Sequence, residues 1–177
     1  LHDDRLAVGD HCKGGIGMND PRNLFDLTGR TALITGGSRG LGLQLAEALG
    51  DFGARLVISS RKQADLEAAQ AHLSARGIDV STFVCDNAVD EQAFALADTA
   101  IARLGRVDIL VNNAGASWGA PTEDHPIDAF DKIMNLNIRA LFVLSQRIAK
   151  QSMIPNRYGR IINMSSMAGL RGADGLV

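Results

Sequence analysis

The chain has 177 residues, of which 46% are hydrophobic and 21% charged, and its formal net charge is −2 at pH 7. This composition suits one compact domain, and the absence of like-charge blocks and long apolar runs argues against binding to nucleic acid or a membrane. Cys12, Cys85 and the four scattered histidines have no spacing typical of a disulfide framework or metal site, so we expect a reducing, cytoplasmic setting.

The chain begins with residues 1–23, which we interpret as a leader outside the folded part. Residues 1–17 lack the basic start and apolar middle of a signal peptide, and the first methionine is Met18. The leader is therefore expected to be disordered, or to be sequence from upstream of the natural start. Residues 24–177 are then expected to be the N-terminal part of a single domain.

From Thr31 onward, short apolar runs alternate with segments of helical periodicity. Five strands are predicted at residues 31–35, 55–60, 79–86, 107–115 and 159–165. Four helices are predicted at residues 40–53, 63–77, 91–105 and 126–150. The apolar face of the first helix is assigned to Leu41, Leu45, Ala48, Leu49 and Phe52. This alternation predicts an α/β fold: a Rossmann-type, doubly wound parallel sheet with helices on both faces, strand order 3-2-1-4-5, incomplete after the fifth strand.

A glycine-rich loop, TGGSRGLG, joins the first predicted strand to the first helix. Glycines there permit a tight turn and close approach of a phosphate to the free N–H groups of the helix. Leu43 and Gln44 stand where a P-loop needs Lys and Ser or Thr, which excludes that motif. The alternative is a turn without a ligand. The candidate cofactor-binding residues of the loop are Thr35, Gly36, Ser38, Arg39, Gly40, Leu41 and Gly42.

The end of the second strand indicates which dinucleotide is bound. A carboxylate there suits the ribose hydroxyl of NAD(H), whereas an arginine suits the 2′-phosphate of NADP(H). Ser60 and Arg61 end this strand without a carboxylate, and Arg39 offers a second cation. The sequence therefore favours NADP(H), with NAD(H) as the alternative if these cations are only solvated surface charges.

Three motifs in order resemble the short-chain dehydrogenase/reductase family: TGGSRGLG, NNAG at residues 112–115, and NMSS at residues 163–166. The resemblance covers residues 24–177. Within the family, the chain is similar to bacterial 3-oxoacyl-carrier-protein reductases and gluconate 5-dehydrogenase-like members. The resemblance implies that residues 24–177 belong to one dinucleotide-binding domain.

Further cofactor-binding residues are expected at the ends of the third and fourth strands. Small Ala114 and Gly115 beside Asn113 would let the ribose and nicotinamide lie against the backbone; a polar turn is the alternative. The resemblance implies that Asp86, next to Asn87, accepts a hydrogen bond from the adenine amino group. Asp86 could instead cap the following helix or form an Asx-turn.

Asn137 and Ser166 are the candidate catalytic residues. Asn137 interrupts an apolar helical stripe, and a buried amide needs partners. The resemblance implies that Asn137 disturbs the helix and holds a water in a proton relay, whereas a satisfied core amide is the alternative. Of the alternating pair Ser165 and Ser166, the family pattern selects Ser166 to bind the substrate carbonyl; a turn-forming serine is the alternative.

The family's catalytic Tyr-x-x-x-Lys follows the serine and would lie beyond Val177. Tyr158 precedes the fifth strand and the last lysine is Lys150, so neither substitutes. We therefore expect an NADP(H)-dependent oxidoreductase acting on a small carbonyl or alcohol, present as an inactive fragment.

Two alternative functions stay open. One is a non-catalytic dinucleotide-binding short form, and the other is an NAD-dependent sugar-acid or polyol dehydrogenase. A homodimer or homotetramer is expected in the full-length form, because the fourth helix is apolar on more than one face. The resemblance places this helix against its symmetry mate.

Overall fold

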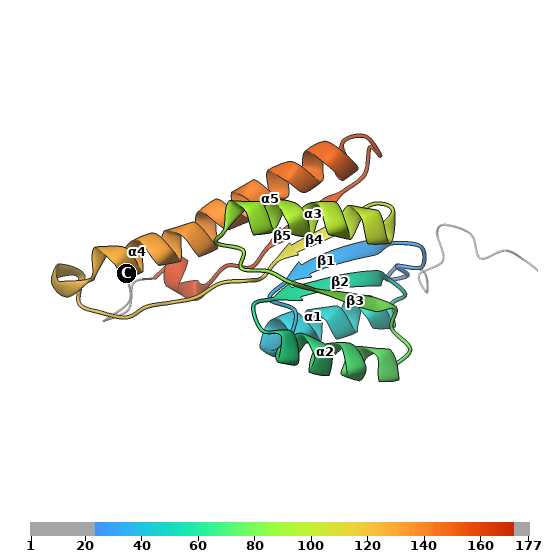
Figure 1. Cartoon of the computed structure of the whole chain (residues 1–177), viewed down its shortest axis with the longest axis horizontal. Coiled ribbons are helices and arrows are strands. Elements are labelled where there is room, and N and C mark those ends of the chain that lie inside the picture. The colour runs from blue at the N-terminus through green and yellow to red at the C-terminus, as the bar shows by residue number, and fades with distance from the viewer. Residues whose placement is uncertain (1–23, 172–177) are drawn as a thin grey trace, which may run out of the picture.

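The computed structural model describes residues 24–171, so the predicted leader lies outside the described residues. Its centre is a five-stranded parallel sheet with strand order β3-β2-β1-β4-β5 (Figure 1). The strands are β1 (Thr31–Thr35), β2 (Arg55–Ser60), β3 (Val80–Val84), β4 (Ile109–Asn112) and β5 (Arg160–Asn163). This order confirms the topology predicted from the alternation of apolar and periodic segments.

Helices cover both faces of the sheet, with α1 and α2 on one side and α3 and α5 on the other (Figure 1). The α-helices are α1 (Gly40–Asp51), α2 (Gln63–Ala75), α3 (Asp90–Leu104), α4 (Ile127–Met134) and α5 (Ala140–Ile148). Short 3₁₀ turns are η2 (Thr122–Asp124) and η5 (Met167–Gly169). None of the helices in residues 24–171 has both the length and the apolar character needed to cross a bilayer.

Alternate residues of each strand point to opposite faces, which divides the core into two clusters. On β1, Ile34 packs with the cluster under α1 and α2, whereas Leu33 packs with the cluster under α3 and α5. Both side chains are fully buried. A strand that is apolar on both faces is what a sheet covered on both sides requires.

The apolar face predicted for α1 is confirmed in part, since Leu45 and Leu49 pack against the core cluster. Leu41 and Phe52 are exposed, and the buried residues are Gly42 and Ala46. Small residues therefore face the sheet, which lets the helix backbone approach it closely.

The predicted long helix is one continuous run with two π-helical segments. The first, η3 (Asn135–Arg139), separates α4 from α5, and the second, η4 (Ala149–Met153), follows α5. The α4 end of the run projects past the carboxyl edge of the sheet (Figure 1). Arg147 of α5 donates hydrogen bonds of 2.9 and 2.6 Å to Asp98 of α3, which ties the run to the sheet's helical layer. This bonding holds the pKa of Asp98 below its usual value.

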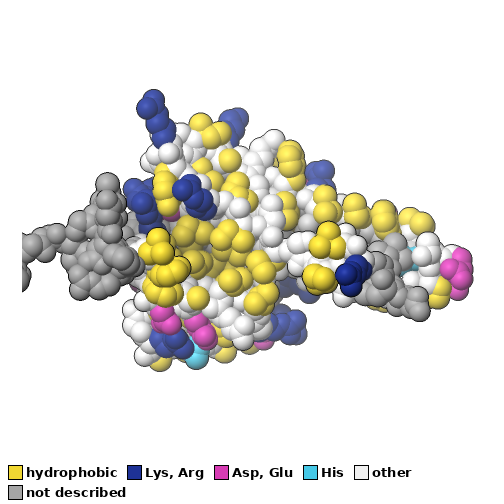
Figure 2. Space-filling model, turned by 180° about the vertical axis from the view of Figure 1, so that it is seen from behind, with side chains coloured by type: hydrophobic (Ala, Val, Ile, Leu, Met, Phe, Trp, Pro, Cys, Tyr) yellow, Lys and Arg dark blue, Asp and Glu magenta, His cyan; other side chains and the backbone are white. Residues whose placement is uncertain are grey.

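The last strand, β5, forms one edge of the sheet as described. It pairs with β4 alone, and all its residues are exposed. Ile161 and Ile162 point to opposite faces, and each keeps more than two-fifths of its surface open. Figure 2, seen from the side on which β5 lies, shows apolar side chains gathered near the middle of that face. Within residues 24–171, neither face of β5 has the helical cover that β1 has.

Candidate functional site

The carboxyl ends of the strands open into a cleft of about 150 Å³. Strand order reverses between β1 and β4, and such a switch point is where open α/β sheets bind ligands. Most of the predicted cofactor-binding residues line this cleft. They are Gly36, Ser38, Arg39, Ser60, Arg61, Asp86, Asn87, Asn113, Ala114 and Gly115.

The hydroxyl of Thr35 joins the glycine loop to the end of β4. Its oxygen accepts hydrogen bonds from the N–H groups of Asn113 and Ala114, both at 3.0 Å. The same hydroxyl donates to the carbonyl oxygen of Val111 at 3.3 Å. Thr35 is buried. Its hydrogen bonds hold together the two loops that form the floor of the cleft.

The side chain of Asn113 makes a second set of bonds to the glycine loop. Its Nδ2 atom donates to the carbonyl oxygens of Thr35 and Gly36, at 3.1 and 3.2 Å. Gly36 has a φ of +66°, and a Cβ at Gly42 would overlap the Gly36 carbonyl oxygen. Only glycine fits at these two positions, because the loop, the start of α1 and the Asn113 amide are in direct contact.

The start of α1 is available to an anion. Gly40 is its first residue, no side chain among the described residues caps its N-terminus, and its first turn holds no acidic residue. The first N–H groups of a helix have no partner within the helix and carry its positive dipole end. The exposed side chain of Leu41 is not part of the cleft lining.

Two arginines form the basic part of the cleft wall. Arg39 comes from the glycine loop and Arg61 follows β2, and both side chains are exposed. No ion pair between described residues involves either guanidinium group. Ser60 lies beside them in the lining. The structure thus brings together the residues that the sequence assigned to a 2′-phosphate.

The segment after β3 supplies the opposite wall. The Oδ1 atom of Asp86 accepts from the N–H of Ala88 at 3.0 Å, so the Asx-turn considered from the sequence is confirmed. The Cys85 thiol donates to Asn87 Oδ1 at 3.3 Å. Burial raises the pKa of Cys85 to about 12, with a further contribution from the charge of Asp86, so the thiol stays protonated at neutral pH.

Asn137 lies inside the π-helical segment η3 and contacts the loop after β4. Its Oδ1 atom accepts from Ala116 N–H at 3.0 Å, and its Nδ2 atom donates to Ala116 C=O at 2.8 Å. The predicted disturbance of the helix is present, and the side chain is half-buried with its amide paired. A role in proton transfer stays a prediction.

Ser166, a predicted catalytic residue, does not line the cleft. Its exposed side chain accepts a hydrogen bond from Ala168 N–H at 3.2 Å and so caps η5. This contact matches the turn-forming alternative considered from the sequence. A role for Ser166 in binding a carbonyl stays a prediction.

Tyr158 lies away from this site, before the amino end of β5. The guanidinium of Arg30 stacks 4.1 Å from the centre of the tyrosine ring, and that of Arg160 lies 4.9 Å from it. The cleft lies at the carboxyl ends of the strands, on the opposite side of the sheet from Tyr158. Tyr158 therefore has no access to a substrate bound at the carboxyl edge.

Two residues of the cleft lining, Cys85 and Leu136, were missed by the sequence analysis. Leu136 directly precedes Asn137, and that adjacency was the available signal. Cys85 precedes Asp86 and is buried, as its place at the end of a strand suggests. Among residues 24–171, no cluster of three His, Cys, Asp or Glu side chains could hold a metal ion.

Residues 30–177 match the family model described as short chain dehydrogenase. The chain belongs to the short-chain dehydrogenase family. It is 40% identical over 151 residues to gluconate 5-dehydrogenase of Gluconobacter oxydans, covering 85% of this chain and 58% of the relative. It is 38% identical over 149 residues to a rhamnolipid-biosynthesis 3-oxoacyl-[acyl-carrier-protein] reductase of Pseudomonas aeruginosa, covering 82% and 58%.

Solved structures of the family superimpose closely on the chain. An NAD⁺-bound xylitol dehydrogenase has a TM-score of 0.81 at 31% identity, with 85% of this chain and 58% of that one covered. A metagenomic short-chain oxidoreductase in complex with NADP has a TM-score of 0.80 at 35% identity, with 85% and 68% covered. The chain thus spans somewhat more than half the length of the curated relatives it matches.

The bonds of Thr35 lead to a first prediction. Thr35→Val keeps the shape of the side chain but leaves the N–H groups of Asn113 and Ala114 without their acceptor. We expect the free energy of unfolding to fall by about 1–3 kcal/mol, measured by urea titration. Thr35→Ser keeps the hydroxyl and is the matched control. Equal losses in the two variants would contradict the assigned role of the hydroxyl.

Proposed function

We propose that the chain is the nucleotide-binding part of an NADP(H)-dependent oxidoreductase. The whole enzyme would transfer a hydride between nicotinamide and a small carbonyl compound or secondary alcohol. The observation that carries this proposal is the cleft at the strand-order reversal, with the glycine loop fixed to the NNAG segment through Thr35 and Asn113. Family membership supports it. The reducing, cytoplasmic setting is proposed with it, because buried Cys85 is a free thiol.

The residues present fit a nicotinamide dinucleotide. The uncapped start of α1 offers N–H groups to the pyrophosphate, and Gly36 and Gly42 let the glycine loop lie directly against α1 and Asn113. Asp86 keeps its Oδ2 atom without a hydrogen-bond partner among the described residues, so it retains an acceptor for the adenine amino group. When bound, the cofactor supplies or accepts the hydride.

The cofactor preference rests on Arg39 and Arg61. Guanidinium groups match phosphate oxygens in charge and geometry, and β2 ends in Ser60 where a carboxylate would suit NAD(H). Relatives and neighbours differ here, since one solved structure holds NADP and another holds NAD⁺. An NAD-dependent dehydrogenase of a sugar acid or polyol is the alternative outcome of the following test.

We predict that Arg61→Asp weakens NADPH binding about tenfold or more, which corresponds to about 1.4 kcal/mol, and strengthens NADH binding. The physical reason is that the carboxylate repels the 2′-phosphate and suits the 2′-hydroxyl. Isothermal titration calorimetry with each cofactor measures both affinities.

Arg103→Asp is the control for this charge reversal, because Arg103 lies near the far end of α3 and bonds only the Thr82 carbonyl there. The cofactor preference of the Arg103→Asp variant should match that of the unmodified chain. The assignment of NADP(H) would be overturned if the unmodified chain bound NADPH and NADH with equal affinity and Arg61→Asp changed neither affinity.

We further propose that this chain does not supply the acid catalyst. Hydride transfer to a carbonyl needs a proton for the developing alkoxide. The chain's one tyrosine, Tyr158, lies against the guanidinium groups of Arg30 and Arg160 near the amino edge of the sheet, and the last lysine of the chain is Lys150. Ser166 would bind the substrate carbonyl, and Asn137 would hold a water for the proton relay.

The 177-residue chain is accordingly predicted to bind NADPH without turning over ketones. Loss of general acid catalysis alone lowers the rate of the reaction by about 10²–10⁴-fold. NADPH oxidation with a panel of ketones, followed by absorbance, measures the rate. Turnover that disappears in Ser166→Ala would contradict the prediction and show that another residue supplies the proton.

A homo-oligomer is proposed for the full-length protein, with the long helix as its interface. An exposed apolar stripe runs along α4, η3 and α5 at spacings of three or four residues. It comprises Ile127, Phe130, Met134, Ile138 and Phe142. A monomer seldom exposes so continuous a stripe, and a second copy of the same helix offers a matching surface.

We predict that Ile138→Glu in the full-length protein lowers the oligomer mass toward that of a monomer. The added charge would be buried without a partner in the interface. Light scattering after size exclusion measures the mass. Lys150→Glu, an exposed change beyond the stripe, should leave the mass unaltered. A monomeric mass for the unmodified full-length protein would refute the proposal.

A further inference from the structure

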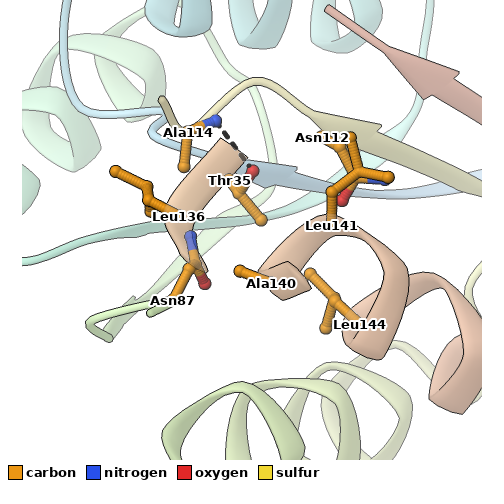
Figure 3. A pocket seen from close by; sticks show the side chains of 8 residues that line it. All are labelled: Thr35, Asn87, Asn112, Ala114, Leu136, Ala140, Leu141 and Leu144. Carbon is orange, nitrogen blue, oxygen red and sulfur yellow. Dashed lines mark hydrogen bonds between the residues drawn. The ribbon is translucent and has the colours of Figure 1, made fainter. Parts of the chain in front are cut away.

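A small pocket adjoins the cleft and shares Asn87, Ala114 and Leu136 with its lining. About 10 Å³ of it is open to the centre of a water molecule, which is roughly the space of one water. Figure 3 shows side chains from the ends of β1 and β4, from the segment after β3 and from the long helix around it. The lining residues are Thr35, Asn87, Asn112, Ala114, Leu136, Ala140, Leu141 and Leu144.

Three polar side chains reach this cavity, and one has no bonding capacity left. The Thr35 hydroxyl accepts two hydrogen bonds and donates one, as described above. A hydroxyl has one donor and two acceptor sites, so all three are used. The amides of Asn87 and Asn112 are therefore the groups to be accounted for.

The two amides leave complementary atoms open. Asn112 Nδ2 uses both hydrogens, on Ser145 Oγ and Asn163 Oδ1, each at 2.9 Å. Its Oδ1 atom has no hydrogen-bond donor among the described residues. Asn87 is bonded through its oxygen, because the Cys85 thiol donates to Oδ1. This bond leaves the Nδ2 donor of Asn87 open.

Both side chains are almost entirely buried. Asn87 is 7% exposed and Asn112 is 5% exposed. Buried polar groups are almost always hydrogen-bonded, and internal waters bridge groups of this kind. No hydrogen bond joins Asn87 directly to Asn112, whereas one open donor and one open acceptor line the same water-sized space. Figure 3 shows these two side chains on opposite sides of that space.

We propose that one water molecule in this cavity accepts a hydrogen bond from Asn87 Nδ2 and donates one to Asn112 Oδ1. It thereby links the wall of the nucleotide cleft, which Asn87 also lines, to β5. The link continues because Asn112 bonds Asn163, and the Asn112 carbonyl accepts from Met164 N–H at 3.0 Å. Asn87 and Asn112 are positioning residues in this scheme, since they act on the strand that leads to Ser166.

The water itself is tested by a crystal structure of the unmodified 177-residue chain. We expect a density peak within about 3 Å of both Asn87 Nδ2 and Asn112 Oδ1. The same cavity in Asn87→Leu should hold no water, because leucine fills the space and offers no donor. A cavity without density in the unmodified chain, or a direct bond between the two amides, would overturn the proposal.

The link to β5 is tested by hydrogen exchange at Met164 N–H. In Asn87→Leu we expect Met164 to exchange about tenfold faster relative to Ile34 in β1, because only the β5 side loses a support. A merely structural loss would speed both amides alike, and that result would reject the link. Gln70→Leu is the matched control, since Gln70 on α2 bonds the Val80 carbonyl far from the cavity. If Asn87→Leu does not fold, the density in the unmodified chain still decides the water.

The coupling to cofactor rests on the proposed function and is separated from it by a further measurement. NADPH should slow exchange at Met164 in the unmodified chain. In Asn87→Leu it should leave that exchange unaltered even at an NADPH concentration that calorimetry shows to saturate the variant, a check that is needed because Asn87 also lines the cleft. If NADPH does not bind, the proposed function is refuted. The electron density in the cavity and the exchange ratio of Met164 to Ile34 without cofactor still test whether the bridging water is present. If NADPH binds but leaves Met164 unaffected in the unmodified chain, the coupling is refuted.

Discussion

The buried hydroxyl of Thr35 is the contact on which the site depends. A parallel sheet brings the ends of β1 and β4 to the same edge, but pairing of the strands stops at that edge. Beyond it, the glycine loop and the residues after Asn112 are not paired as strands. One hydroxyl bonds three backbone groups of the β4 end, and the Asn113 amide returns two bonds to the glycine loop. Two segments that are far apart in the sequence thus form the floor of the cleft, and their hydrogen bonds hold each in place against the other.

Much of this fold follows from the sequence, because the alternation of short apolar runs and periodic segments constrains it so strongly. Right-handed crossovers and burial of both sheet faces leave few arrangements for five strands. The error in α1 has a physical cause. Counting large apolar residues gave the correct period, but the sheet selects Gly42 and Ala46, because close packing of the helix requires small residues there. Periodicity indicates that a helix has a face, whereas packing distance decides which face it is.

The site residues were predicted as a group more successfully than as individual contacts. Motifs at the strand ends indicated which residues share the cleft, since parallel strands place their carboxyl ends together. Side-chain partners were harder to foresee. Asp86 forms the Asx-turn and Ser166 the turn contact that the sequence offered only as alternatives. The bonds between Asn137 and Ala116 were not foreseen, because they depend on local backbone geometry that no motif records. Leu136 was missed because an apolar helical residue has no polar pattern to mark it.

The exposed position of β5 also affects how the chain behaves in solution. An edge strand presents a row of unpaired N–H and C=O groups, and here Ile161 and Ile162 add apolar surface on both faces. Such a strand is a template for another extended segment, which would add to the sheet by the same ladder that joins β4 to β5. No proline or lysine lies within Arg160–Asn163 to oppose this. Arg160 alone places a charge there, so we expect self-association through β5 to increase as the concentration of the 177-residue chain is raised.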